Sequence, residues 1–162
     1  MATRKGLVKK TVLSAYSKPR KGGIYAIDIR DGDTLIEARI TNGENDILLG
    51  TRGGKSIRFS EKNIRPTGRK TMGVKGITLS SADDKVVGML LIKREGTVLV
   101  ATENGFGKRT EIAQYRAQKR GGKGVLTMKT TEKLGKMITI KEVVGTDDLM
   151  IIRDDGVLIR MP

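Results

Sequence analysis

The chain has 162 residues, and its 32 lysines and arginines outnumber 18 acidic residues to give a formal net charge of +14. It contains no cysteine and no histidine, which excludes disulfides, thiol or imidazole catalysis and the usual zinc ligands, so we expect no metal and no cofactor. Since no apolar run approaches the ~20 residues that span a bilayer, we expect a cytoplasmic protein that binds a polyanion and no membrane.

The chain carries an internal repeat that is aligned on four glycines. They are Gly6, Gly54, Gly105 and Gly156, at spacings of 48, 51 and 51 residues. Short apolar runs precede the last three glycines, at residues 47–49, 98–100 and 149–152, and short alternating stretches follow them. Each unit therefore predicts a strand, a tight turn and a second strand.

Two further β-prone segments recur along the chain. One begins 19 residues before an aligned glycine, at Leu35, Val86 and Met137. The other follows a second glycine, at Gly23, Gly76 and Gly124, in sequences such as GITLS and GVLTM. Together with the hairpin, these segments predict about four strands in each unit.

Four-stranded units that recur every ~40 to 50 residues are typical of the blades of a propeller or a related radial assembly. We expect an all-β fold with units at about residues 1–34, 35–85, 86–136 and 137–162, the end units being incomplete, and one helical turn near residues 111–116. Because a complete radial domain closes on itself, we interpret the chain as part of a larger disc. Its open strand edges predict self-association.

Basic residues recur at equivalent places in the repeat. The net charges of residues 1–54, 55–105 and 106–162 are +4, +5 and +5, so the charge does not sit in a tail. A cation stands four residues after each aligned glycine, and in two units the residue before it is also basic. These residues are Lys10, Arg58, Arg109 and Arg160, with Lys9 and Lys108 as the two preceding residues. Evenly repeated cations can follow the phosphates of a duplex without reading its bases, although any single one could simply be solvated.

A second group of cations lies on predicted loops before the second glycine of each unit. It comprises Arg20 and Lys21, then Arg69, Lys70 and Lys75, then Lys119, Arg120 and Lys123. Neighbouring glycines, such as Gly22 and Gly23, permit positive φ and remove side-chain bulk. These glycines could serve only the turn, or could also let backbone amides approach phosphate oxygens.

The remaining polar residues predict no catalysis. The acidic pairs at residues 83–84, 147–148 and 154–155 fall at predicted turns, where capping explains them. Tyr16, Tyr25 and Tyr115 are interpreted as packing residues of strands and loops. We therefore expect a binding module and not an enzyme.

The segment QKRGGKG carries the most specific signal, because three cations and three glycines in seven residues are hard to explain by packing. It resembles the glycine-rich box in the C-terminal domains of DNA gyrase A subunits. GFGKRTEIAQYRAQ, GRKTMGVKGITL and DLMIIRDDGVLIRM also resemble blades of that family, so the resemblance covers essentially the whole chain. The matching residues of the box are Gln118, Lys119, Arg120, Gly121, Gly122, Lys123 and Gly124, with Arg116 just before them.

The resemblance implies a β-pinwheel, a six-bladed disc whose basic rim wraps double-stranded DNA and supports negative supercoiling. About three blades' worth is present here. It also implies, as partners, the remainder of the gyrase A subunit, together with the gyrase B subunit, in an A2B2 complex. The loop between Arg65 and Lys75 departs from the box, so we expect it to contribute charge only. Two alternatives stay open: the related domain of the topoisomerase IV A subunit, or a protein-interaction propeller that docks an acidic partner.

Overall fold

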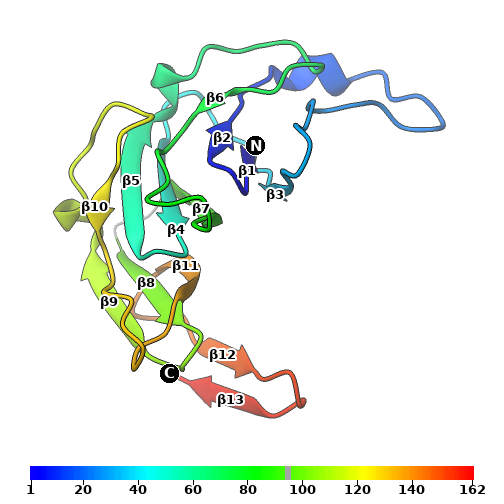
Figure 1. Ribbon diagram of the computed structural model, residues 1–162. Helices are drawn as coiled ribbons and strands as arrows, with labels where there is room; N and C mark the ends of the chain where they lie inside the picture. Colours follow the sequence, from blue (N-terminus) through cyan, green and yellow to red (C-terminus); the bar gives the residue numbers. More distant parts are fainter. Residues whose placement is uncertain (94–95) are drawn as a thin grey trace.

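The computed structural model describes residues 1–93 and 96–162, which form antiparallel sheets arranged side by side along a crescent (Figure 1). The first sheet is built on the hairpin of β1 (Ala2–Thr3) and β2 (Leu7–Val8). β3 (Leu35–Glu37) pairs with β1, and β6 (Val74–Lys75) pairs with β2, which gives the order β3-β1-β2-β6.

The second sheet repeats this plan with longer strands. Its hairpin joins β4 (Asp46–Thr51) to β5 (Lys55–Ser60). β7 (Val86–Ile92) pairs with β4, and β10 (Val125–Leu126) pairs with β5. We call β6 and β10 the outer strands of these two sheets. Each comes from the part of the chain that follows the next hairpin, since β6 follows β4 and β5, and β10 follows β8 and β9.

The third sheet has the order β11-β8-β9 and comprises β8 (Thr97–Thr102), β9 (Gly107–Glu111) and β11 (Met137–Val143). A fourth hairpin joins β12 (Leu149–Ile152) to β13 (Leu158–Met161) and projects from the end of the crescent (Figure 1). Within the described residues, no strand pairs with β9 and β13 in the way that β6 pairs with β2 and β10 pairs with β5.

The all-β prediction is confirmed, as are the hairpins at the aligned glycines and the strands that begin at Leu35, Val86 and Met137. The strand predicted after Gly76 is wrong, because β6 ends before that glycine. The amides of Gly76 and Ile77 both donate to the carbonyl oxygen of Gly6, at 2.8 and 3.3 Å, so the chain bends there instead of continuing along β2. Residues 24–30, after Gly23, form no strand either.

Short 3-10 turns follow three of the hairpins. They are η1 (Leu13–Tyr16), η2 (Glu61–Asn63) and η3 (Ile112–Gln114), of which the sequence predicts only η3. A turn of three or four residues is too short to leave a helical period in the sequence. No helix in the part of the chain that the structure describes is long and apolar enough to cross a bilayer.

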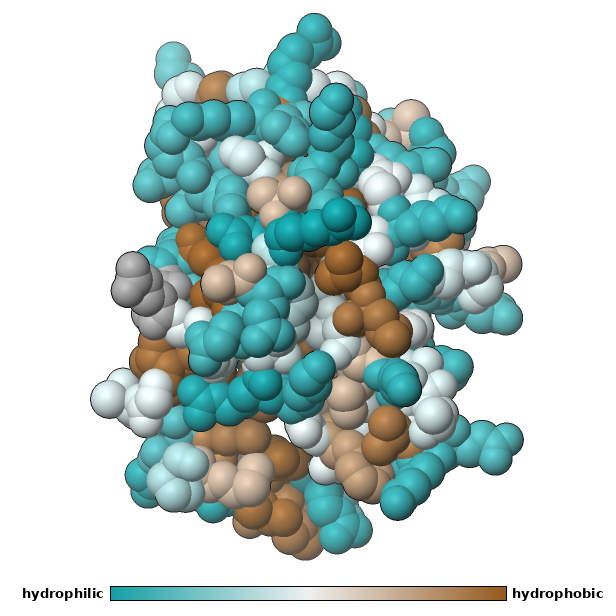
Figure 2. All heavy atoms as spheres, turned by 90° about the vertical axis from the view of Figure 1, so that its left-hand side faces the viewer, coloured by the Kyte–Doolittle hydropathy of each residue, from teal (hydrophilic) through white to brown (hydrophobic). Residues whose placement is uncertain are grey.

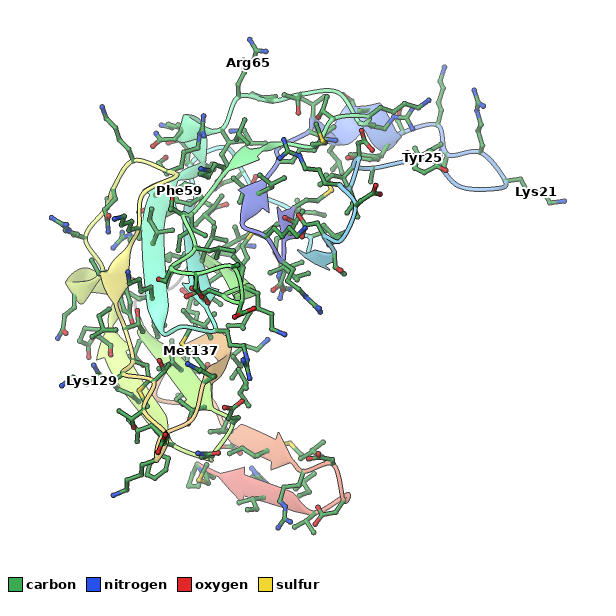
Figure 3. All side chains as sticks on the ribbon, viewed as in Figure 1. Lys21, Tyr25, Phe59, Arg65, Lys129 and Met137 are labelled. Carbon is green, nitrogen blue, oxygen red and sulfur yellow. The ribbon has the colours of Figure 1, made fainter. Side chains whose placement is uncertain are left out.

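Two hydrophobic cores lie between successive sheets. The first lies between sheets one and two and contains Phe59, Ile57 and Ile77, and the second lies between sheets two and three and contains Leu48 and Met137. Alternation along β4 explains the division, because Leu48 points to one core while its neighbours point to the other. Sheet two therefore contributes to both cores, and Figure 3 shows Phe59 and Met137 on the inside of the crescent's body.

Candidate nucleic-acid interface

The convex side of the crescent, which we call the outer edge, carries β6, β10, the 3-10 turns η2 and η3 and the loops that connect them (Figure 1). Seen face on, this side is covered largely by hydrophilic residues, with apolar residues gathered toward its lower end (Figure 2). The C-terminal hairpin lies at that lower end (Figure 1) and exposes Ile152, Leu158 and Ile159. The outer edge is therefore largely hydrophilic, and its apolar part lies toward the C-terminal hairpin.

The glycine-rich loop, residues 118–124, is held on the neighbouring unit by its backbone. The amide of Gly121 donates to the carbonyl oxygen of Gly76 at 2.6 Å, and the amide of Thr78 donates to the carbonyl oxygen of Gly122 at 2.8 Å. The Thr78 hydroxyl also donates to the carbonyl oxygen of Gly121 at 2.6 Å. Because Gly121 N–H is already bonded, the hypothesis that the loop offers its amides to phosphate does not hold at this residue.

Gly124 explains why the loop requires glycine at its end. Its φ is +71°, and a Cβ there would lie well inside van der Waals contact of the carbonyl oxygen of Ser56 on β5. Gly73 occupies the equivalent place before β6, with φ +91°, and a Cβ on it would lie only 2.5 Å from the carbonyl oxygen of Val8. Glycine therefore lets the outer strand approach the hairpin closely.

The three cations of the glycine-rich loop divide into two kinds. Arg120 donates to the carbonyl oxygens of Asn63, at 2.9 Å, and Lys75, at 3.1 Å, so it holds η2 and β6 in place. Lys119 and Lys123 are exposed side chains of the same loop. The two lysines are therefore accessible to solvent, whereas Arg120 has a structural role.

Other predicted loop cations are also on the surface. Lys70, Lys75 and Arg116 are exposed and Arg69 is half-buried. Arg20 and Lys21 lie on the exposed loop at residues 17–23, which projects from the body of the crescent with Lys21 at its tip (Figure 3). The structure thus brings the loops at 65–75 and 116–124 together on the outer edge and leaves the loop at 17–23 apart from them.

Two outer-edge cations were missed by sequence reasoning. Arg65 and Lys129 are exposed and point away from the body along the outer edge (Figure 3). Arg65 and Arg116 each precede a residue that forms a parallel bridge to the preceding hairpin, Pro66 with Lys10 and Ala117 with Arg58. Aligning the two segments on η2 and η3 would have matched Arg65 with Arg116. A 3-10 turn, however, leaves little signal in a sequence.

The cations four residues after the aligned glycines make intramolecular contacts. Arg58 pairs with Asp46 at 2.8 Å and donates to the carbonyl oxygens of Ile112 and Tyr115 at 3.2 and 3.3 Å. Arg160 pairs with Asp148, and the Arg109 side chain donates to the Thr97 hydroxyl at 2.9 Å. Of these, Arg109 and Arg160 are exposed and Arg58 is half-buried.

Lys9 is a correction to the predicted set. Its side chain is buried, with 3% exposure, and its ammonium donates to the carbonyl oxygens of Ala26, at 2.7 Å, and Arg69. Burial, and then the nearby charge of Arg69, lower the pKa of Lys9, against the opposing effect of Asp28. Lys9 therefore links the segments that contain Ala26 and Arg69 through hydrogen bonds, and its buried charge is not accessible to a phosphate. Lys108, its counterpart, is exposed and lies 3.5 Å from the carbonyl oxygen of Thr127.

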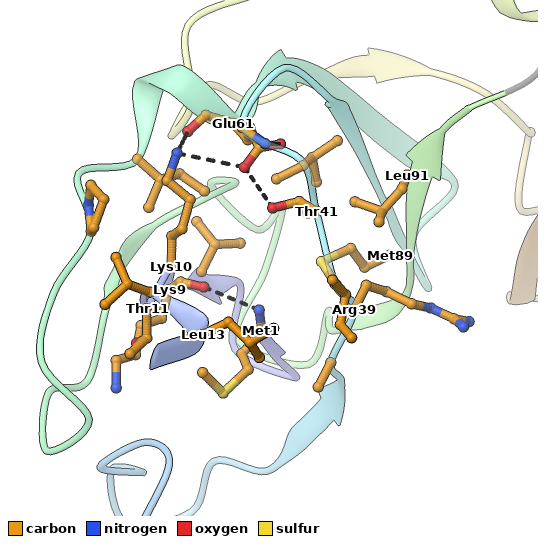
Figure 4. A pocket seen from close by; sticks show the side chains of 18 of the residues that line it. Met1, Lys9, Lys10, Thr11, Leu13, Arg39, Thr41, Glu61, Met89 and Leu91 are labelled. Atoms are coloured by element: carbon orange, nitrogen blue, oxygen red, sulfur yellow. Dashed lines mark hydrogen bonds and ion pairs between the residues drawn. The ribbon is translucent and has the colours of Figure 1, made fainter. Parts of the chain in front are cut away.

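Lys10 belongs to a buried network around Glu61. The Glu61 carboxylate accepts hydrogen bonds from the Thr41 hydroxyl at 2.7 Å and from the amides of Gly43 and Asn45 at 3.0 and 2.9 Å, and it lies 3.5 Å from the Lys10 ammonium (Figure 4). Burial alone would raise the pKa of Glu61, but these hydrogen bonds and Lys10 outweigh it and hold the pKa below its ordinary value of 4.5. The network borders a cavity of about 570 Å³ between sheets one and two.

No group of acidic side chains suited to a metal ion occurs among the described residues. The acidic pairs cap turns as predicted: Asp84 accepts the Gly53 amide at 2.8 Å, Asp147 accepts Val144 at 2.9 Å and Asp155 accepts Val157 at 3.3 Å. Tyr115 is buried in the second core, whereas Tyr25 is 76% exposed and packs little.

The chain matches a family model described as DNA gyrase C-terminal domain, beta-propeller, over residues 1–42, 45–93 and 96–143. It is 46% identical over 162 residues to the DNA gyrase A subunit of Staphylococcus epidermidis strain ATCC 12228 and, at the same identity, to that of Staphylococcus aureus strain MRSA252. Each match covers 99% of this chain and 18% of the relative, so the chain spans less than a fifth of the relatives' length.

Two solved structures are similar in fold. The C-terminal domain of DNA topoisomerase IV superposes with a TM-score of 0.92 at 24% identity, over 99% of this chain and 50% of that one. The DNA gyrase A C-terminal domain superposes with a TM-score of 0.86 at 25% identity, over 98% of this chain and 53% of that one.

Proposed function

Because this chain belongs to the DNA gyrase C-terminal domain family, we propose that its outer edge binds the sugar-phosphate backbone of double-stranded DNA and bends the duplex around the crescent. The observation that carries the proposal is the geometry of the outer edge. Exposed cations stand on successive loops, such as Arg65 and Lys70 on one and Lys119 and Lys123 on the next, and each loop is fixed to the hairpin before it.

The physical basis is repeated phosphate contact. Cations that stand one unit apart on a curved edge meet phosphates that are evenly spaced along a duplex, and such contacts carry no sequence information. Bending a segment of ~20 to 30 base pairs costs on the order of 1 to 6 kcal/mol, which several successive contacts can offset. We therefore propose weak sequence preference. The remaining cations of the proposed contact set are Arg69, Lys75, Lys108, Arg109, Arg116 and Lys129, together with Arg20 and Lys21 on the loop that lies apart from the outer edge.

In a longer polypeptide this module would act as the non-catalytic DNA-wrapping part of a type II topoisomerase. We propose that its partners are the remainder of a gyrase A subunit, together with a gyrase B subunit, in an A2B2 complex, and that it works in the cytoplasm on the nucleoid. The 46% identity to gyrase A subunits supports gyrase over topoisomerase IV as the parent enzyme. The module would favour negative supercoiling by the complete, ATP-hydrolysing gyrase complex.

The test is DNA binding measured by fluorescence anisotropy across a salt series, with end-labelled FRET on the same ~40-base-pair duplex to report bending. In the double variant K119A/K123A, we expect weaker binding to every sequence and a salt slope that is smaller by about 1.8, since each phosphate contact contributes ~0.9. Bending should decrease too, while the melting temperature stays unchanged because both side chains are exposed.

The matched control is K93A/K141A, which removes the same charge from two exposed lysines that lie outside the loops at 65–75 and 116–124, one after β7 and one within β11. This control should bind and bend DNA like the unaltered chain. Equal losses in both double variants would mean that only net charge matters and would contradict the outer-edge assignment. Binding that does not depend on salt, or preference for an acidic protein over DNA, would favour the protein-interaction alternative.

A further inference from the structure

The chain contains two Asn-Gly sequences, Asn42–Gly43 and Asn104–Gly105, whose surroundings differ. An asparagine before a glycine can lose its side-chain amide group, because the next backbone nitrogen attacks the side-chain carbonyl carbon and glycine has no side chain to hinder the attack. The reaction is favoured when the two atoms are held close together. It is favoured further by a base that takes the backbone proton and by a donor to the oxygen that becomes negative.

The Asn42 side chain folds back over the Gly43 nitrogen. Its Oδ1 accepts a hydrogen bond from the Glu44 amide at 2.9 Å. This bond closes a ring that contains both the Asn42 Cγ and the Gly43 nitrogen, which are the two atoms that must join. The Glu44 amide is also placed to stabilise the negative charge that develops on Oδ1 when Cγ becomes tetrahedral.

A carboxylate accepts the hydrogen bond of the attacking nitrogen. The Gly43 amide donates to Glu61 Oε1 at 3.0 Å, and Glu61 is fully buried. Burial would raise the pKa of Glu61, but its hydrogen bonds and Lys10 hold that pKa below 4.5, so the carboxylate is ionised at neutral pH. Because the N–H bond lies in the peptide plane, the proton can pass to Glu61 while Cγ approaches the nitrogen from one face.

Asn104 has different partners, although both asparagines are exposed. Its Nδ2 donates to the carbonyl oxygens of Glu132 and Lys133 at 3.0 and 3.1 Å, so the amide group is held by another segment of the chain. The Gly105 amide donates to the Thr102 carbonyl oxygen at 3.0 Å. A carbonyl oxygen accepts hydrogen bonds but is not a base at neutral pH, so this nitrogen keeps its proton.

We propose that Asn42 is a site of spontaneous deamidation, promoted by the Glu61 carboxylate and the Glu44 amide. The Gly43 nitrogen gives its proton to Glu61 and bonds to the Asn42 Cγ. The bond from Cγ to Nδ2 then breaks, and Nδ2 leaves as ammonia with that proton, which gives a five-membered imide between residues 42 and 43. Water reaches the exposed site and opens the imide at either carbonyl, so that position 42 becomes an aspartate or an isoaspartate.

The modification acts on the junction between sheets one and two. Either product adds a negative charge near Glu44, and an isoaspartate also lengthens the main chain by a carbon atom, which moves the Gly43 amide away from Glu61. Glu61 begins η2, which leads into the loop at 65–75 on the outer edge. Loss of this hydrogen bond is therefore expected to weaken the hold of the buried network on that loop. The reaction needs no DNA and does not rest on the proposed function.

The experiment incubates the folded chain at neutral pH and then digests it with trypsin, which releases residues 40–52 and 95–108 as separate peptides with one Asn-Gly each. Mass spectrometry follows the replacement of the amide NH2 by OH, and enzymatic methylation detects isoaspartate. We expect deamidation at Asn42 to be about tenfold faster than at Asn104 in the folded chain, and the two rates to be equal in concentrated urea. Equal rates in the folded chain would overturn the proposal.

Two variants separate the base from the network around it. E61Q removes the proton acceptor, whereas T41V removes only the hydroxyl that donates to Glu61 Oε2 at 2.7 Å and leaves Oε1 beside the Gly43 amide (Figure 4). At a temperature at which circular dichroism shows both variants folded, we expect the Asn42 rate to fall about tenfold in E61Q and to change by about threefold at most in T41V. Equal falls in both variants, or no fall in E61Q, would contradict the role of Glu61. The comparison of Asn42 with Asn104 needs no variant and decides the proposal even where E61Q is unstable.

Discussion

The cation four residues after each aligned glycine makes a different set of contacts in each unit. Lys10 donates to the carbonyl oxygen of Glu61 at 2.9 Å, and Arg58 reaches Ile112 in the corresponding 3-10 turn of the next unit. Arg109 donates to Thr97 on β8, and Arg160 donates to Asp148, the residue before β12. At the scale of single residues, this position joins one unit to the next in the first two units, where Lys10 and Arg58 reach the following 3-10 turn.

Replacing Glu61 tests the buried network at this junction. E61Q keeps the shape of the side chain but replaces its carboxylate by a neutral amide. The Thr41 hydroxyl and two backbone amides then have a poorer acceptor, and Lys10 loses its ion-pair partner. We expect a loss of about 2 to 4 kcal/mol in the free energy of unfolding, because a buried charged acceptor is removed from several donors. Urea unfolding followed by circular dichroism measures it, and a loss no greater than that of E44Q, an exposed glutamate, would contradict the assignment.

The same carboxylate predicts how stability depends on pH. The pKa of Glu61 is lower in the folded chain than its ordinary value of 4.5, so its contribution is fully present above pH 4.5 and is lost as the pH falls through the folded-state pKa. E61Q should therefore lose less stability than the unaltered chain on acidification below pH 4.5. Parallel losses in both proteins would show that other carboxylates dominate.

At the scale of elements, the outer strands depend on backbone contacts more than on length. β6 and β10 have two residues each, too few to be stable by themselves. The glycines that precede them allow the chain to lie against β2 and β5, and the hydrogen bonds from residues 76–77 and 127–128 wrap it around the hairpin turns. The loops that carry the exposed cations are thereby fixed relative to the sheets.

Adding one methyl group to such a glycine should release the outer strand. G124A would place Cβ against the Ser56 carbonyl oxygen at a φ of +71°, which disfavours a side chain. We expect about 2 kcal/mol or more of destabilisation, measured by thermal unfolding, together with weaker DNA bending because the loop at 118–124 is displaced. G145A, which meets no atom within 4 Å and has no positive φ, is the control and should change neither property.

At the scale of the whole molecule, the sheets form a linear array in which sheet two joins both cores. Leu48 of β4 lies in the second core, while Ile47 and Leu49 on either side of it lie in the first. Units of repeat proteins are stabilised mainly by their immediate neighbours. Because sheet two belongs to both interfaces, a substitution that destabilises one core should also destabilise the other.

Truncating one large side chain in each core tests this coupling. F59A in the first core should cost about 3 to 5 kcal/mol, and M137A in the second about 2 to 5 kcal/mol, since both side chains are fully buried. Calorimetry should show a single unfolding transition in each variant, shifted to lower temperature. Two separate transitions in either variant would mean that the cores unfold independently.

The amino-acid sequence by itself determined the repeat and the hairpins, and it predicted the class of partner. Alternation around the aligned glycines and the strands beginning at Leu35, Val86 and Met137 depend on local periods, which a sequence displays directly. The excess of basic residues and the segment QKRGGKG likewise belong to composition and order. These features predict the all-β array and a polyanionic ligand without reference to tertiary contacts.

Only the tertiary structure decided which cations face outward and which strand completes each sheet. Lys9 and Lys119 are both lysines of basic segments, yet one is buried against carbonyl oxygens and the other is exposed. The difference arises because the outer strand of a sheet comes from a later part of the chain, so a cation can bond residues far away in the sequence. Lys9 donates to Arg69, 60 positions away, and Arg120 donates to Asn63, 57 positions away. Such long-range pairing leaves no local period, and the folded chain alone reveals it.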